Sequence, residues 1–135
     1  KLVNDTCGHD AGDVLLAAVG REIKECFNRN DLVIRLGGDE FAVVMHMAEE
    51  VAVQEACQRV RDRIAAHNRE HGAVPVSVSI GWAIGQATDV ISTNAIIKEA
   101  DTLMYKEKEE NRLKYAELFA KRLSQYGQKL FQVNK

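Results

Sequence analysis

Two adjacent acids, Asp39 and Glu40, follow two glycines and precede an aromatic residue in the stretch RLGGDEF. Apolar, β-branched segments flank this stretch, so two like charges lie side by side where the pattern otherwise predicts strands. Carboxylates this close repel each other unless a cation lies between them, and a hard divalent ion is the usual solution. We favour magnesium over calcium because few carboxylates converge and the stretch does not resemble an EF-hand loop. The alternative is a polar hairpin tip with solvated acids.

The elements that must position these acids alternate between helical and strand patterns. Segments 32–36 and 40–47 are short and β-branched, and Gly37-Gly38 between them predicts a tight hairpin turn with positive φ. A loop, Asn4 to His9, precedes a predicted helix that has Asp10 as N-cap and Asp13 in its first turn and ends near Asn28. Further predicted elements are a helix at 48–71, a strand at 75–85 and a helix capped by one of Ser92, Thr93 and Asn94. This alternation predicts the α/β class, with helices packed against a sheet.

Composition narrows the possible classes of protein. The 135 residues are 46% hydrophobic and 28% charged, which indicates one globular domain with a hydrophobic core. A formal net charge of -2 gives no general attraction to nucleic acid or anionic membranes, so we expect no nucleic-acid partner. Three cysteines without CxxC spacing suggest neither a disulfide framework nor a zinc site, and a reducing cytoplasm fits them best. We find neither a membrane-spanning run nor a signal peptide in the sequence.

Four motifs occur in order over more than 100 residues: KLVNDTCGHDAGD, RLGGDEF, SVSIGWA and ADTLMYKEKEENR. Together they resemble the GGDEF domain, the diguanylate cyclase family, from Lys1 to about Arg112. The resemblance implies an α+β sandwich of the nucleotidyl cyclase or polymerase palm type, with a central, mostly antiparallel sheet flanked by helices. We therefore expect a GGDEF domain at residues 1–112 and a C-terminal helical extension at 113–135.

The resemblance also implies an activity. Family members condense two GTP molecules into cyclic di-GMP and release two pyrophosphates, with each domain of a homodimer presenting one GTP to the other. Two Mg²⁺ or Mn²⁺ ions in each half-site neutralise charge. By this resemblance Asp39 is a metal ligand, Glu40 is either a metal ligand or the group that helps deprotonate the hydroxyl, and Gly37 and Gly38 lie against the phosphates.

Guanine and phosphate contacts follow from the same resemblance. Asn4 and Asp13 match the residues that read the base, and an acid and an amide suit the N1–H and amino group of guanine. Their alternative roles are to cap a turn and to complement the helix dipole, while His9 and Asp5 shape the loop. The residues that match phosphate-binding cations are Lys1, Lys108 and Arg112. Acids and Lys106 crowd around the last two, so an ordinary solvated helix face is their alternative.

The sequence departs from the family pattern at three places. The family's first strand carries a metal-binding Asp, and this strand would precede Lys1; we expect both upstream, which leaves open whether the sequence is active as given. Asn28 replaces the arginine of the inhibitory RxxD motif while Asp31 is retained, so we expect no tight inhibition by cyclic di-GMP. Asn111-Arg112-Leu113 replaces a glycine, arginine, asparagine group, and six Lys or Arg against one Glu then follow from Arg112 to Lys135. This extension is either a capping helix with a basic face or a contact to a partner.

The sequence is compatible with an active enzyme and with two non-catalytic roles. An active cyclase is favoured because the residues at the motif positions have the required types. Its rival is a non-catalytic module that binds GTP or cyclic di-GMP without turning it over, and a weaker possibility is a dimer partner for other domains. We also expect an upstream sensor or regulatory domain, which could tether a cytoplasmic GGDEF domain to a membrane-anchored sensor.

Overall fold

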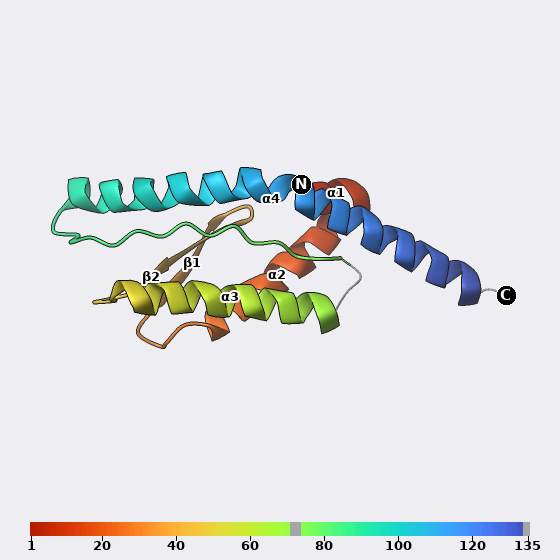
Figure 1. Ribbon diagram of the computed structural model, residues 1–135, viewed down its shortest axis with the longest axis horizontal. Coiled ribbons are helices and arrows are strands. Elements are labelled where there is room, and N and C mark those ends of the chain that lie inside the picture. The colour runs from red at the N-terminus through yellow and green to blue at the C-terminus, as the bar shows by residue number, and fades with distance from the viewer. Residues whose placement is uncertain (71–73, 134–135) are drawn as a thin grey trace. The chain divides into compact units, whose positions relative to one another are not determined.

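The structure is a computed structural model and describes residues 1–70 and 74–133 (Figure 1). In chain order its elements are α1 (Leu2–Cys7), α2 (His9–Glu25), β1 (Leu32–Gly37), β2 (Glu40–Val44), α3 (Glu50–Glu70) and α4 (Val90–Val133). The chain divides into two compact units, Lys1–His67 and Asn68–Lys135. Helices combined with an antiparallel sheet give the α+β class that the sequence predicts.

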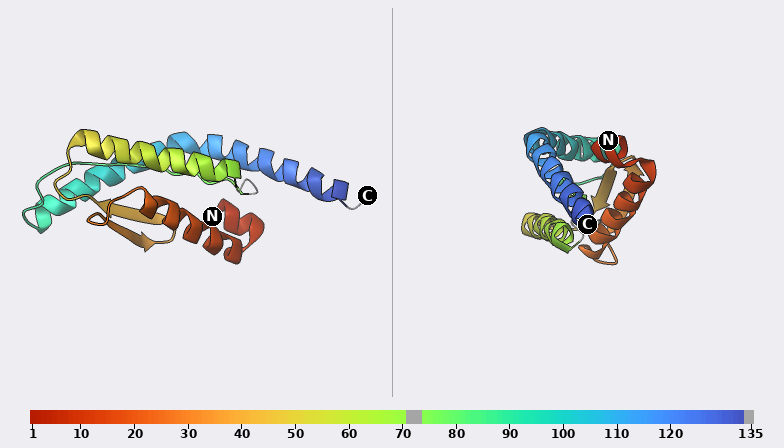
Figure 2. Two further views of the ribbon diagram at one scale, coloured as in Figure 1. Left: turned by 90° about the horizontal axis from the view of Figure 1, so that it is seen from below. Right: turned by 90° about the vertical axis from the view of Figure 1, so that its right-hand side faces the viewer.

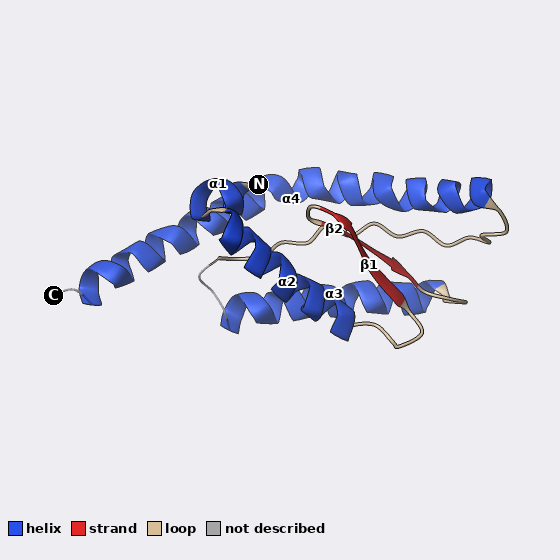
Figure 3. Cartoon of the chain, turned by 180° about the vertical axis from the view of Figure 1, so that it is seen from behind, coloured by secondary structure: helices blue, strands red, loops and turns tan. Residues whose placement is uncertain are grey.

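The predicted hairpin is confirmed. Strands β1 and β2 pair antiparallel, from Leu32 opposite Val44 to Gly37 opposite Glu40 (Figure 3). The register shifts between Arg35 and Gly37, which is a bulge near the turn. Strand β2 ends at Val44, before the predicted end at Met47. Met47 has a positive φ of 53°, a conformation that a strand does not accommodate.

The predicted loop from Asn4 to His9 is wrong, because most of it is the short helix α1. Helical bonds run from the Asp5 N–H to the Lys1 carbonyl and from the Gly8 N–H to the Asn4 carbonyl. Gly8 then has a φ of 88°, which ends α1 and starts α2. Asp10 is therefore not the N-cap of α2 but lies in its first turn. Asp13 lies one turn later than predicted.

Helix α3 matches the prediction apart from its ends, since it starts at Glu50 and the predicted end at position 71 lies outside the described residues. Its buried residues include Ala56, Val60 and Ile64, which repeat every four residues and form one apolar stripe. Polar contacts join α3 to α2: Arg63 binds Glu22 and Glu25, and the Nε of Arg59 donates to the Cys26 carbonyl at 3.3 Å.

The predicted strand at 75–85 is wrong. Residues 74–85 have an extended backbone that runs alongside α4, but no strand is assigned to them (Figures 2 and 3). A strand requires a ladder of backbone hydrogen bonds with a neighbour. Here side chains take the place of that ladder: the Val76 N–H donates to Asn68 and the Ile80 N–H donates to the Glu107 carboxylate.

Helix α4 begins at Val90, two residues before Ser92, the earliest of the predicted capping candidates. The Asp89 carboxylate accepts the Ser92 N–H at 2.7 Å, and the Ser92 hydroxyl accepts the Asp89 N–H at 3.1 Å. This reciprocal pair is a capping box, so Asp89 is the cap and Ser92 is its partner inside the helix. The helix continues without interruption to Val133. Within the described residues, no helix combines the length and apolar character needed to cross a membrane.

Candidate active site

The tip of the β1–β2 hairpin carries the RLGGDEF motif, residues 35–41. Gly37 and Gly38 have φ values of 154° and 52°, which L side chains rarely adopt. A Cβ added at either glycine would meet nothing within 4 Å. The glycines are therefore required by the backbone, and their surface lies open to a ligand.

Arg35 and Phe41 hold this turn in place. The Nε and Nη2 of Arg35 both donate to the Gly38 carbonyl, at 3.1 and 2.8 Å. Phe41 stands opposite Arg35 in the register, and its ring packs on Gly20 of α2, where an added Cβ would lie 3.3 Å from a ring carbon. The turn is thus fastened to its own strand and to the helix that carries Asp13.

Asp39 and Glu40 are both exposed at the turn. Their oxygens are hard donors of the kind that magnesium and manganese bind, and the open glycines beside them leave room for an ion with its phosphate. Among the described residues, no group of three or more His, Cys, Asp or Glu side chains gathers to hold a metal ion. The pair thus fits a divalent ion by donor type and would supply only part of its coordination.

The side chain of Asn4 lies against Gly12, the residue that precedes Asp13. A Cβ at Gly12 would lie 2.9 Å from the Asn4 Cγ and closer still to its Oδ1, so the amide of Asn4 rests on the backbone of Gly12. Asp13 is the next residue and is exposed in the second turn of α2. The helix dipole acts within the first turn, which weakens the interpretation of Asp13 as a dipole partner. An amide and a carboxylate are the groups that offer the donor and acceptors a guanine edge requires.

The predicted phosphate cations lie elsewhere in the chain. Lys108 and Arg112 are exposed on α4, in the unit Asn68–Lys135, and their spacing of four residues stacks them on one side of the helix. Lys1 is exposed at the N-terminus of α1. The phosphate-binding roles of these three side chains stay predictions.

Asn28 and Asp31 close a turn after α2. The Asn28 N–H donates to the Asp31 carboxylate at 2.9 Å, and the Asp31 N–H donates to the Asn28 carbonyl at 3.1 Å. Asp31, the retained acid of the inhibitory motif, therefore stabilises this turn. The absence of a tight inhibitory site stays a prediction.

Shifted pKa values occur away from the hairpin tip. The hydrogen bond from Arg63 lowers the pKa of Glu22, and the positive charge of Arg63 acts in the same direction. Burial raises the pKa of the Cys26 thiol. Hydrogen bonds from Ser92 lower the pKa of Asp89 at the start of α4. Each of these groups stabilises a helix end or a helix contact.

Two residues at the site were not assigned a role from the sequence. Gly12 leaves room for the Asn4 amide on α2, and Arg35 holds the turn of the β1–β2 hairpin. Gly12 lies eight residues before Gly20 on α2, and both glycines accept a side chain from another element. Glycines inside an otherwise regular helix pattern are the signal that could have found such contacts, since they weaken a helix unless something packs on them.

Comparison with known proteins places the chain in a family. The family described as "Diguanylate cyclase, GGDEF domain" matches residues 1–114. This chain belongs to the GGDEF domain family of diguanylate cyclases, whose palm-type α+β fold it shares. Bacterial relatives link the family to cyclic di-GMP signalling.

Three curated relatives illustrate the range of names. Diguanylate cyclase A of Treponema denticola is 30% identical over 113 residues, which cover 83% of this chain and 30% of the relative. The probable diguanylate cyclase DgcT of Escherichia coli K12 is 34% identical over 119 residues, or 84% and 26% of the two chains. The cyclic di-GMP phosphodiesterase PdeB of Shewanella oneidensis is 36% identical over 103 residues, or 75% and 12%. The chain thus spans less than a third of the length of these relatives.

Proposed function

We propose that this domain is a diguanylate cyclase, which joins two GTP molecules into cyclic di-GMP at the interface between two copies of the chain. The observation that carries the proposal is the hairpin tip. Asp39 and Glu40 are exposed beside two open glycines, and Arg35 and Phe41 hold the turn that presents them. A rigid tip with two acids and an accessible backbone suits a metal-bound triphosphate.

In the proposed reaction each GTP supplies both a nucleophile and an electrophile. The 3'-oxygen of one GTP forms a bond to the α-phosphorus of the other, the bond from this phosphorus to the bridging oxygen breaks, and pyrophosphate leaves. Asp39 would hold divalent ions, Mg²⁺ or Mn²⁺, two in each half-site, and Glu40 would either help to hold them or accept the hydroxyl proton. When bound, such ions neutralise the charge that develops on the phosphate oxygens.

Base selection is proposed for Asn4 and Asp13. The Asp13 carboxylate would accept hydrogen bonds from the N1–H and the amino group of guanine, and the Asn4 amide would both donate and accept. Adenine has neither the N1–H nor the 2-amino group of guanine, so it would leave the Asp13 carboxylate without hydrogen-bond partners. The contact of Asn4 with Gly12 supports this assignment because it holds the amide against the residue that precedes Asp13.

The remaining parts of the proposal concern cations, partners and location. Lys108, Arg112 and Lys1 would bind phosphate groups. Two copies must meet for turnover, because each contributes one GTP. We further propose that a regulatory domain controls this meeting in the complete protein, that the domain itself lies in the cytoplasm, and that the segment 113–135 is an extension beyond the GGDEF domain.

A second candidate function is a regulatory module that binds GTP or cyclic di-GMP without turnover. The observation that favours it is the similarity to PdeB, which is named as a phosphodiesterase and is as similar to this chain as the named cyclases are. The intact Gly37–Phe41 motif argues for the cyclase, since both acids and both glycines are retained.

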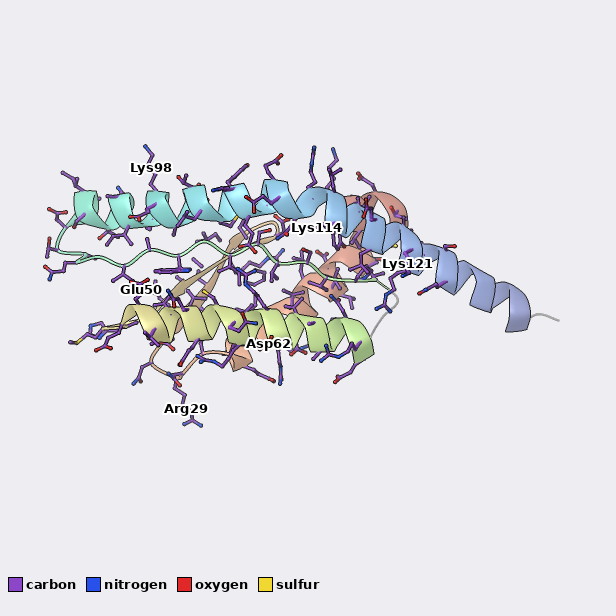
Figure 4. All side chains as sticks on the ribbon, viewed as in Figure 1. Arg29, Glu50, Asp62, Lys98, Lys114 and Lys121 are labelled. Atoms are coloured by element: carbon purple, nitrogen blue, oxygen red, sulfur yellow. The ribbon has the colours of Figure 1, made fainter. Side chains whose placement is uncertain are left out.

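The test is product analysis of the natural protein that contains this sequence, incubated with GTP and Mg²⁺ and separated by chromatography. The parent should yield cyclic di-GMP and the Asp39→Asn variant none. Asp62→Asn is a matched control, because Asp62 is an exposed acid on α3 outside every motif (Figure 4). Equal product from the parent and Asp39→Asn would contradict the assignment, and bound but unchanged GTP would favour the regulatory module.

A further inference from the structure

The extended segment 74–85 is fastened along α4 at several levels. The Tyr115 hydroxyl donates to the Pro75 carbonyl at 2.7 Å, and the Ile80 N–H donates to the Glu107 Oε2 at 2.9 Å. Further along, the segment packs so tightly on α4 that two of its glycines leave no room for a side chain. A Cβ at Gly81 would lie 2.9 Å from that of Met104, and one at Gly85 would lie 2.7 Å from Ile96. Residues with higher numbers in the segment contact residues with lower numbers in α4, so the two run antiparallel (Figure 1).

Glu107 is the polar centre of this contact. One of its carboxylate oxygens accepts the Ile80 N–H, and the other accepts the side-chain amide of Asn111 at 3.4 Å. Asn111 is the residue that stands where the family signature has glycine. The departure from the signature therefore has a structural role in this chain, because it supplies the second partner of Glu107.

These contacts set the rotation of α4 about its axis. At 100° per residue, the positions that face the segment, which are 96, 100, 104, 107 and 115, fall within one arc of the helix. The midpoint between Lys108 and Arg112 lies about 90° around the helix from the centre of that arc. Both cations lie on one side of the contact face, and any rotation or slide of α4 against the segment changes the direction in which they project.

We propose that Glu107, supported by Asn111 and Tyr115, is a positioning residue that aims Lys108 and Arg112 at the phosphates of the nucleotide. The inference rests on the proposed function, since it concerns the phosphate-binding pair of that site. Tyr115 lies just beyond residues 1–114, which match the family, so the start of the extension takes part in this task.

Replacing Glu107 by alanine leaves the half-buried Ile80 N–H without its acceptor and removes the partner of Asn111. A glutamine removes the charge but keeps an oxygen for the Ile80 N–H, and its NH2 group can donate to the Asn111 oxygen once the Asn111 amide turns over. We call the hydrogen bonds of Glu107 to Ile80 and Asn111 the clamp. Comparing Glu107→Ala with Glu107→Gln therefore separates the effect of losing the clamp from the effect of losing the negative charge. Glu109→Ala is a matched control, because Glu109 is an exposed acid of the same helix turn that does not face the segment.

The experiment measures cyclic di-GMP formation over a range of GTP concentrations for the natural protein and these variants. Glu107→Ala should raise KM about tenfold and change kcat less than about twofold, as expected when a binding contact is lost uniformly. Glu107→Gln and Glu109→Ala should stay within about twofold of the parent in both constants. Tyr115→Phe, which removes one hydroxyl and should fold, should raise KM by about two- to threefold.

Hydrogen exchange of the Ile80 amide provides a readout that is independent of activity. The exchange should be faster in Glu107→Ala than in Glu107→Gln. Faster exchange with an unchanged KM would overturn the proposal, because the clamp would then exist without positioning the cations. A parent that binds Mg²⁺–GTP but makes no product would contradict the cyclase, and the same ranking in Kd would still support the clamp. A parent that does not bind GTP would overturn both.

Discussion

Replacing Gly12 by alanine should separate helix stability from nucleotide binding. The added Cβ would lie 2.9 Å from the Asn4 Cγ and closer still to its Oδ1, whereas ordinary contact begins at 3.4 Å, so the Asn4 amide must leave its position on Gly12. The atoms that must move are the far end of a flexible side chain. The helix can therefore accept the alanine, but the amide loses its place on the residue that precedes Asp13.

The substitution should change the stability of the protein and its affinity for GTP in opposite directions. Alanine is about 1 kcal/mol more favourable than glycine inside a helix, so the free energy of unfolding should stay level or rise. A lost hydrogen bond to the base is worth about 1.4 kcal/mol, which corresponds to a tenfold weaker affinity for GTP. The assays are thermal unfolding and calorimetric titration with Mg²⁺–GTP on the same samples.

A double-mutant cycle with Asn4→Ala controls this prediction. If Gly12→Ala acts through Asn4, it should have no further effect on the Kd for GTP once the amide is gone. Weaker binding by Gly12→Ala in the Asn4→Ala background would refute the reasoning, and so would unchanged binding by Gly12→Ala alone.

Further predictions concern the turn, the inhibitory motif and pH. Arg35→Ala should raise KM for GTP about tenfold through loss of the forked contact with the Gly38 carbonyl, whereas Arg29→Ala, an exposed arginine after α2, should match the parent in a steady-state assay (Figure 4). Cyclic di-GMP should not inhibit the enzyme tightly; submicromolar binding by calorimetry that Asp31→Ala abolishes would show this to be wrong. Because Arg63 lowers the pKa of Glu22 below its ordinary 4.5, the stabilisation is present above that pH and is lost as pH falls further. Glu22→Gln should therefore flatten the acid side of the stability curve in denaturant titrations, and an unchanged slope would argue against the contact.

Local patterns were sufficient for the hairpin and for most of α3 and α4. Two glycines between β-branched segments predict a turn because few other residues adopt the required φ, and Gly37 and Gly38 have positive φ values. The helical stretches were recognisable from apolar residues on one face. Their ends were less certain, because Asp89 and Asp10 are both capping types and only the observed hydrogen bonds distinguish them.

The elements that failed depend on partners outside their own segment. The polar residues of α1 suggested a loop, yet local backbone bonds form a helix there. Residues 75–85 alternate like a strand, but Glu107 and Tyr115 of α4 bind their backbone groups instead of a neighbouring strand. The contact of Asn4 with Gly12 could not be read from spacing, because it depends on how α1 folds back on α2.

The most direct test of the cyclase assignment is the ratio of pyrophosphate to cyclic di-GMP released from GTP by the natural protein, measured at concentrations where two copies associate. The account predicts two pyrophosphates for each cyclic di-GMP, with both products absent in Asp39→Asn. Pyrophosphate release without cyclic di-GMP, or GTP that stays bound and unchanged, would contradict the claim that two copies of this hairpin tip form one active cyclase.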